Sequence, residues 1–163
     1  MVVIGIDPGY AIVGYGVIEV VRGNIVPIAC GVIETPKEES IPVRLAMLDE
    51  KLSLLIKKYS PNAIAVEELF FNTNTTTAIK VAQARGVILL NAIKQCGELY
   101  EYTPLQVKQA LTGNVRADKH QMQYMVRALL GLSETPKPDD AADALAIAIC
   151  HAQTTDFRKR VLN

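Results

Sequence analysis

The sequence predicts an α/β fold in which a mixed five-stranded sheet carries helices on both faces. The N-terminal part contains three β-rich runs joined by short connections with Gly and Pro, which is typical of an antiparallel meander. The rest of the chain alternates helical and strand patterns, which indicates parallel strands with right-handed crossovers. The chain has 163 residues, half of them apolar. This length fits a single domain, residues 1–163, with a core of its own.

The three strands of the meander are expected at residues 2–7, 12–20 and 24–34. They are separated by Pro8-Gly9 and by Arg22-Gly23. Gly and Pro are turn formers, so each strand folds back on the one before it.

The next element, residues 41–59, is expected to be an amphipathic helix. Its apolar side chains recur at helical spacing, at Leu45, Leu48, Leu52, Leu55 and Ile56. The apolar run 62–67 is too short for a helix and is expected to form a buried strand. The second long helix is expected at residues 75–95, because Gly97 is a typical residue just past a helix end.

Four more elements complete the prediction: a strand at 98–102, a helix at 104–111, a helix at 119–130 and a last helix from Pro138 to about Gln153. Thr103 and Asp118 are residue types that cap helix N-termini, and Gly131 is typical of a helix end.

Charge is distributed unevenly along a chain whose net charge is zero. The middle segment, residues 73–131, carries seven basic and three acidic side chains, whereas both ends are net acidic. This distribution fits a basic surface that binds nucleic acid, and it equally fits chance scatter over solvated faces.

The sequence argues against a membrane or secreted protein. The longest run without a charged residue, residues 144–155, is twelve residues long, short of the ~20 that a membrane span needs. Cys30, Cys96 and Cys150 are odd in number and form no C-x-x-C pattern. They are expected to be buried, unpaired thiols in a reducing cytoplasm.

Four acidic residues are expected to converge at one edge of the sheet. Asp7 ends the first strand, Glu67 ends the fourth, and Asp140 and Asp143 lie at i and i+3 on the last helix. Three of them have structural explanations as turn, strand-end or helix-capping residues. Asp143 lies one turn inside a helix that is apolar almost all round, so it needs a cation or hydrogen-bond partners.

Clustered carboxylates suit a hard cation, Mg²⁺ or Mn²⁺, and four of them can share two ions. Such a pair activates water on one side of a phosphodiester and stabilises the leaving oxygen on the other. The alternative, scattered structural acids, stays open on spacing alone. Other chemistries lack support, because His120 and His151 have no metal-ligand spacing and the chain contains no G-x-S-x-G, P-loop or G-x-G-x-x-G motif.

Five short motifs are spread over nearly the whole chain: G-I-D-P-G (5–9), V-E (66–67), Q-A-R-G (83–86), Q-V-K-Q (106–109) and D-A-A-D-A-L-A-I-A (140–148). In these motifs, and in their order, the chain resembles the RuvC-type Holliday junction resolvases of bacteria. Other ribonuclease-H-like proteins have motifs similar to G-I-D-P-G, whereas D-A-A-D-A-L-A-I-A together with the other motifs is specific.

The resemblance implies a ribonuclease-H-like fold and a homodimer that nicks two opposed strands of a four-way DNA junction with Mg²⁺. Carried over by position, the catalytic and metal-binding acids are Asp7, Glu67, Asp140 and Asp143. The resemblance also implies a branch-migration helicase complex as a partner. It assigns no role to Glu68 or Asp139, and Tyr10 is bulkier than the small residue expected there.

Six further residues are candidates for contact with DNA. Lys108 and Lys119 match basic positions that the family uses on DNA, and Arg85 and Arg116 are looser candidates in the same basic segment. Of the adjacent Phe70 and Phe71, one is expected in the core and the other near DNA. The match favours Phe70 for stacking on an unpaired base at the crossover.

The helix at 75–95 carries a stripe of small residues, Ala78, Ala82 and Gly86. This stripe suits close approach of a second copy, and it equally suits packing on the helix's own sheet.

Two alternative functions remain beside junction cleavage. One is a ribonuclease-H-like nuclease for structured RNA, which would not be expected to carry D-A-A-D-A-L-A-I-A. The other is a junction-binding protein without cleavage activity, against which the presence of all four acids argues. An actin-like ATPase would need a duplicated domain, for which the chain is too short.

Overall fold

The computed structural model describes residues 1–69 and 75–161, with only the backbone described at 75, 76 and 156–161. The strands are β1 (Val2–Asp7), β2 (Ile12–Val21), β3 (Asn24–Glu34), β4 (Ala63–Glu67) and β5 (Leu99–Tyr102). The helices are α1 (Ile41–Tyr59), α2 (Thr75–Gln95), α3 (Pro104–Thr112), α4 (Lys119–Leu130) and α5 (Asp139–Val161). This order matches the one predicted from the sequence.

The strands form one mixed sheet in the order β3-β2-β1-β4-β5. The pairs β1–β2 and β2–β3 are antiparallel, which confirms the meander. The pairs β1–β4 and β4–β5 are parallel, so α1 and α2 serve as crossover connections. Strands β1 and β4, which carry the first two predicted acids, are neighbours at the centre of the sheet.

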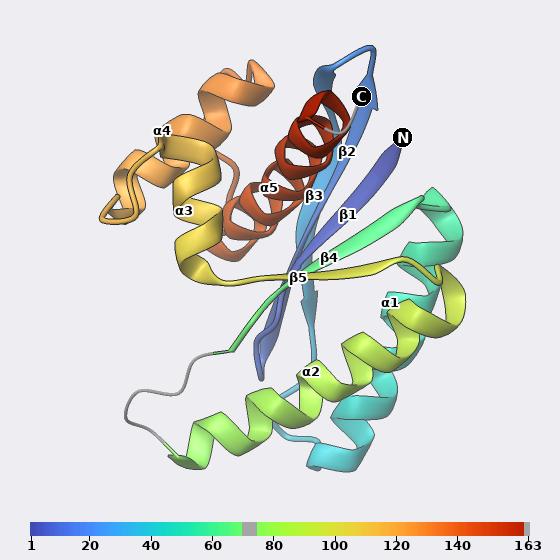
Figure 1. Cartoon of the computed structure of the whole chain (residues 1–163). Helices are drawn as coiled ribbons and strands as arrows, with labels where there is room; N and C mark the ends of the chain where they lie inside the picture. Colours follow the sequence, from blue (N-terminus) through green and yellow to red (C-terminus); the bar gives the residue numbers. More distant parts are fainter. Residues whose placement is uncertain (70–74, 162–163) are drawn as a thin grey trace.

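Helices cover both faces of this sheet (Figure 1), and each face has its own apolar core. Alternation along β1 divides its side chains between the two faces: Val3 packs toward α5, and Ile4 packs toward α1 and α2. On the α5 side, Leu145 and Ile149 are almost wholly buried, and on the other side Leu52 is fully buried. The predicted fold class is therefore confirmed.

Helix α5 is longer than predicted, since it ends at Val161 and not near Gln153. Two threonines follow the apolar part of this helix and look like a helix end in the sequence. In the structure they remain helical, and Thr154 and Thr155 donate their hydroxyl hydrogens to the carbonyls of Cys150 and His151, four residues earlier.

The cysteines are unpaired, as expected, but their burial differs from the expectation. Cys150 is buried and Cys96 is partly buried, whereas Cys30 is exposed. Cys30 lies on β3, which is the edge strand of the sheet and exposes alternate side chains. In the part of the chain that the structure describes, no helix is long and apolar enough to span a membrane.

Candidate active site

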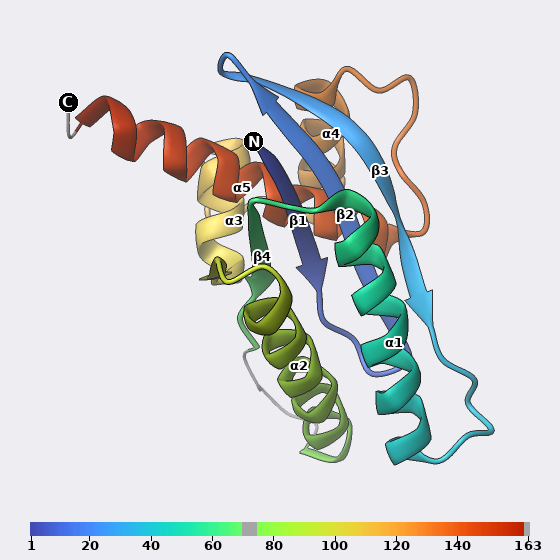
Figure 2. The same ribbon diagram turned by 90° about the vertical axis from the view of Figure 1, so that its right-hand side faces the viewer.

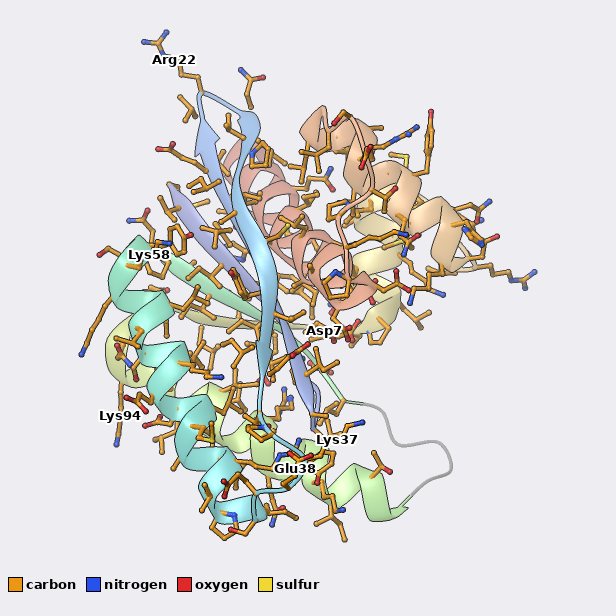
Figure 3. The ribbon with its side chains drawn as sticks, turned by 180° about the vertical axis from the view of Figure 1, so that it is seen from behind. Asp7, Arg22, Lys37, Glu38, Lys58 and Lys94 are labelled. Carbon is orange, nitrogen blue, oxygen red and sulfur yellow. The ribbon has the colours of Figure 1, made fainter. Side chains whose placement is uncertain are left out.

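Asp7 and Glu67 are brought together by the parallel pairing of β1 and β4. The register places Ile6 opposite Val66, so the next residue of each strand is one of the two acids. Both strands point the same way, and their carboxyl ends therefore meet at one edge of the sheet. Figure 3 shows Asp7 near the middle of the molecule, far from Lys58 and Lys94.

Asp140 and Asp143 reach the same edge because α5 packs directly on β1 and β2. A Cβ added at Gly14 would lie 2.0 Å from the carbonyl oxygen of Asp140, and one at Gly5 would lie 2.1 Å from that of Ala144. Any other residue at these positions would push the first turns of α5 away from the sheet. Gly5, the first residue of G-I-D-P-G, thus helps to place the acids of α5.

Three of the four predicted acids, Asp7, Glu67 and Asp143, line one open cleft of about 270 Å³. The fourth, Asp140, does not line the cleft, yet it is close enough for its charge to raise the pKa of Asp7. The walls are otherwise mainly apolar and include Pro104, Val107, Met122 and Ala146. The structure therefore gathers the predicted acids at one place.

Burial and mutual repulsion make these carboxylates hard to ionise. Burial, followed by the charges of Glu67, Asp143 and Asp140, raises the pKa of Asp7 to about 8. Burial and then Asp143 raise the pKa of Glu67 to about 7, and burial is also the main cause that raises the pKa of Asp143. Adjacent carboxylates in an apolar setting favour either protons or a bound cation.

The acids do not form a ready-made metal cage. Among the side chains that the structure describes, at residues 1–69 and 77–155, no three of His, Cys, Asp or Glu are grouped closely enough to hold a metal ion. A Mg²⁺ ion is commonly held by one or two carboxylates, with waters and substrate phosphates as its other ligands. The donor set, which consists of carboxylates alone, fits such a hard cation.

Lys108 and Lys119, the two lysines predicted to contact DNA, line the same cleft as the acids. The ammonium of Lys119 lies 2.8 Å from the carboxylate of Asp139, and both side chains are more than half exposed. The Gln123 amide also donates to Asp139, at 3.0 Å. Asp139, to which the sequence assigned no role, therefore holds Lys119 at the rim of the cleft.

Arg85 is turned inward, and its guanidinium is engaged within the protein. It donates from Nε to the backbone carbonyl of Glu67 at 3.4 Å and forms an ion pair with Glu101 on β5. Glu68 lines a hollow beside this pair. These contacts favour a structural role for Arg85 at the end of β4.

The remaining candidates lie outside the cleft or outside the described residues. Arg116 is exposed in the turn between α3 and α4, and its backbone N–H donates to the Asn114 side chain. Phe70 and Phe71 lie outside the described residues. The burial of Arg44 on α1 was not predicted from the sequence, because a buried arginine on an amphipathic helix gives no local signal.

Comparisons with known proteins agree with this geometry. Residues 3–151 match the family described as crossover junction endodeoxyribonuclease RuvC. A protein of that name from Desulfitobacterium hafniense is 58% identical, covering 99% of this chain and 98% of its own length. Another from Clostridioides difficile is 48% identical, covering 100% of this chain and 96% of its own.

Solved structures show the same likeness. A structure of Thermus thermophilus RuvC superposes with a TM-score of 0.88 at 38% identity, with 97% of each chain covered. The same protein in complex with a Holliday junction substrate gives a TM-score of 0.86 at 37% identity, with 96% of each chain covered. The yeast mitochondrial resolvase Ydc2, at 17% identity and a TM-score of 0.74, shares the fold. This chain belongs to the RuvC family of crossover junction endodeoxyribonucleases.

Proposed function

We propose that this chain resolves four-way DNA junctions by placing one nick in each of two opposed strands, in recombination and repair. The observation that carries the proposal is the cleft in which Asp7, Glu67 and Asp143 meet beside Lys108 and Lys119. Hydrolysis of a phosphodiester requires carboxylates that can hold a metal ion and basic side chains that can bind the phosphate, and this cleft has both. Support also comes from the Thermus relative, whose structure contains a Holliday junction.

Asp7, Glu67, Asp140 and Asp143 are proposed to hold two Mg²⁺ ions per active site, with Mn²⁺ able to replace them. Bound there, the ions would activate the attacking water and stabilise the leaving oxygen. The raised pKa values of Asp7 and Glu67 support this, since both carboxylates would gain from a neighbouring positive charge. Because both carboxylates are largely buried, water screens that attraction less than it would at an exposed site.

The two lysines of the cleft are proposed to hold the DNA backbone over the acids. Lys119 lowers the pKa of Asp7 and Asp143 through its charge, so it already offsets part of their repulsion. Its ion pair is with an exposed carboxylate, Asp139, which a phosphate can replace. Such contacts position a junction without reading its sequence. Phe70, with Phe71 as the second candidate, is still proposed to stack on an unpaired base at the crossover.

A homodimer is proposed to form through the outer face of α2. Ala82 and Gly86 of the small-residue stripe are exposed, and a Cβ added at Gly86 would meet nothing within 4 Å. Ile79, Leu90 and Ile93 lie on the same face and are 62%, 54% and 48% exposed. Apolar and small side chains in one exposed row favour close approach of a second copy.

The family likeness further suggests a branch-migration helicase complex as a partner and the cytoplasm as the location.

The proposal is tested by incubating the protein with an end-labelled mobile four-way junction, with and without Mg²⁺. The expected result is paired, symmetric nicks that require the metal and yield ligatable duplexes. Linear duplex DNA and a structured RNA of equal length serve as control substrates. Binding without cleavage would support the non-catalytic alternative, and preference for the RNA would support the ribonuclease alternative.

A further inference from the structure

Arg44 on α1 is a buried cation whose contacts are all with neutral groups. The residue is 3% exposed. Its Nε–H donates to the Thr35 hydroxyl at 2.9 Å, and its Nη2–H donates to the backbone carbonyl of Tyr10 at 3.3 Å. Neither ion pair found within the described residues involves Arg44. Its charge is thus balanced by dipoles and by an aromatic ring.

That ring belongs to Tyr10, which lies between two cations. The Cζ atom of Arg44 is 4.2 Å from the ring centroid, and the Nζ atom of Lys80 is 4.9 Å from it. Each cation is attracted by the electron-rich ring. The cluster connects four segments: the turn after β1, the residue after β3, the first turn of α1 and the N-terminal part of α2.

Stability does not explain a charge at this position. Burying an ion without a partner of opposite charge is unfavourable, and apolar side chains of equal volume are often as stable or more stable at such sites. The neighbours of Arg44 in the small cavity beside it include Val13, Leu45 and Leu48, which could pack against an apolar side chain. What an apolar side chain could not supply here are the hydrogen bonds of Arg44 to the Thr35 hydroxyl and the Tyr10 carbonyl.

The turn that Arg44 contacts is the one that leaves Asp7. Figure 2 shows this turn running from the end of β1 alongside α1. The turn is tight, since a Cβ added at Gly9 would lie 1.9 Å from the carbonyl oxygen of Ile12. Pro8 has a fixed φ angle. A displacement at Tyr10 is consequently passed along a short, stiff segment to Asp7.

We propose that Arg44 is a positioning residue for Asp7. Arg44 fixes the turn after β1 by contacting both the carbonyl and the ring of Tyr10. This turn then determines where the Asp7 carboxylate lies in the cleft. The effect of Arg44 on cleavage rests on the function proposed above. The structural part of the proposal, that Arg44 controls how the acids bind a divalent cation, is measurable without DNA.

The test is Arg44→Met, which keeps a long, unbranched apolar stem, although a shorter one, and removes the charge and the donors. The melting temperature is expected to stay the same or rise, because an unpaired buried charge is lost. Mn²⁺ affinity of the DNA-free protein, measured by calorimetric titration, is expected to fall about 10-fold, as for loss of an outer partner of a metal ligand. Junction cleavage should fall about 10- to 100-fold, while metal-free junction binding stays unchanged.

Lys51→Met is the matched control, because Lys51 lies on the same helix and donates from its ammonium to the backbone carbonyl of Glu34 at 2.7 Å. This variant should keep Mn²⁺ affinity and cleavage. If Arg44→Met does not fold, Tyr10→Leu removes the ring from between the cations, and Tyr10→Phe should restore Mn²⁺ affinity and cleavage.

The proposal is overturned if Arg44→Met, or Tyr10→Leu in its place, binds Mn²⁺ as the wild type does. It is also overturned if the only defect is weaker junction binding. If the wild type binds Mn²⁺ but cuts no junction, the proposed function fails, and the Mn²⁺ titrations of the variants still decide the role of Arg44.

Discussion

Asp7 is the residue at which burial and charge oppose each other most strongly. It lies among three other carboxylates, and its pKa is raised to about 8 by burial first and by those charges second. An ionised acid in that position is unfavourable without a neighbouring cation, which agrees with the proposed metal site. The charge of the side chain, more than its shape, therefore determines its role.

Amide variants separate these effects at each acid. Asp7→Asn, Glu67→Gln, Asp140→Asn and Asp143→Asn should each lower junction cleavage by at least ~100-fold, more than loss of an outer partner does. Metal-free junction binding should stay equal or tighten, because repulsion of phosphate is reduced. Cleavage is measured as single-turnover rates and binding by gel shift without metal.

Glu68→Gln is the control for this series, since it changes the acid adjacent to Glu67 that lines a different hollow. It should cut junctions at the wild-type rate. A defect in Glu68→Gln together with normal cleavage by Glu67→Gln would move the site by one residue.

The lysines of the cleft are expected to contact DNA phosphates, which makes junction binding depend on ionic strength. Lys108→Ala and Lys119→Ala should each weaken metal-free junction binding and lower its slope against log salt by about one unit, the loss of one phosphate contact. Lys58→Ala is the control, because Lys58 lies far from Asp7 (Figure 3). Unchanged slopes in both cleft variants would leave these lysines as solvated side chains.

The boundaries of the elements could be predicted where local signals were strong. The expected bounds of α1 and α2 match the structure, because the first has an apolar stripe and the second has Gly97 just after it. The end of α5 was predicted too early, since Thr154 and Thr155 remain helical and place their hydroxyls on carbonyls of the preceding turn. Only the structure shows such side-chain bonds.

The same limit applies to the site. That the acids approach one cleft could be predicted, because Asp7 and Glu67 end strands and Asp140 and Asp143 lie in the first two turns of a helix, which are features of local sequence. Their catalytic role stays a prediction. The contact of Arg44 with Tyr10 joins residues 34 positions apart, and that of Arg85 with Glu101 joins two further elements. Pairings of this kind depend on the packing of helices on the sheet, and the chain carries no local pattern for them.

Charged substitutions on the outer face of α2 should weaken the proposed homodimer. Ile79→Glu and Leu90→Glu place charges on two side chains that are 62% and 54% exposed in the single chain. Both should keep the fold, because Glu is a good helix former at exposed positions. Light scattering and sedimentation should show a shift from dimer to monomer, and paired nicking should be lost while single nicks remain.

Leu54→Glu on α1 is the matched control, since Leu54 is 61% exposed on a different helix. It should remain a dimer. A wild-type protein that is monomeric at micromolar concentration, or an Ile79→Glu variant that stays dimeric, would contradict this interface.

At the scale of the whole molecule, the acids make the stability of the fold depend on pH, and a bound cation is expected to change that dependence. The folded-state pKa values of Asp7 and Glu67, about 8 and about 7, lie above the ordinary 3.8 and 4.5. The folded protein thus holds protons that the unfolded chain releases. The contribution of these two groups to stability is fully present below about pH 4 and is lost as pH rises toward 8. A bound cation replaces the protons and should restore it.

Thermal unfolding at fixed protein concentration tests this dependence. Asp7→Asn carries no ionisable group at residue 7, so the metal-free variant should melt above the wild type by a margin that grows from pH 5 to pH 8. Mg²⁺ should raise the wild-type melting temperature more at pH 8 than at pH 6, because fewer protons compete with it, and should raise that of Asp7→Asn less. A margin that does not change with pH would mean that Asp7 is already ionised at low pH in the folded protein. An equal effect of Mg²⁺ at both pH values would mean that the ion binds elsewhere than at these acids.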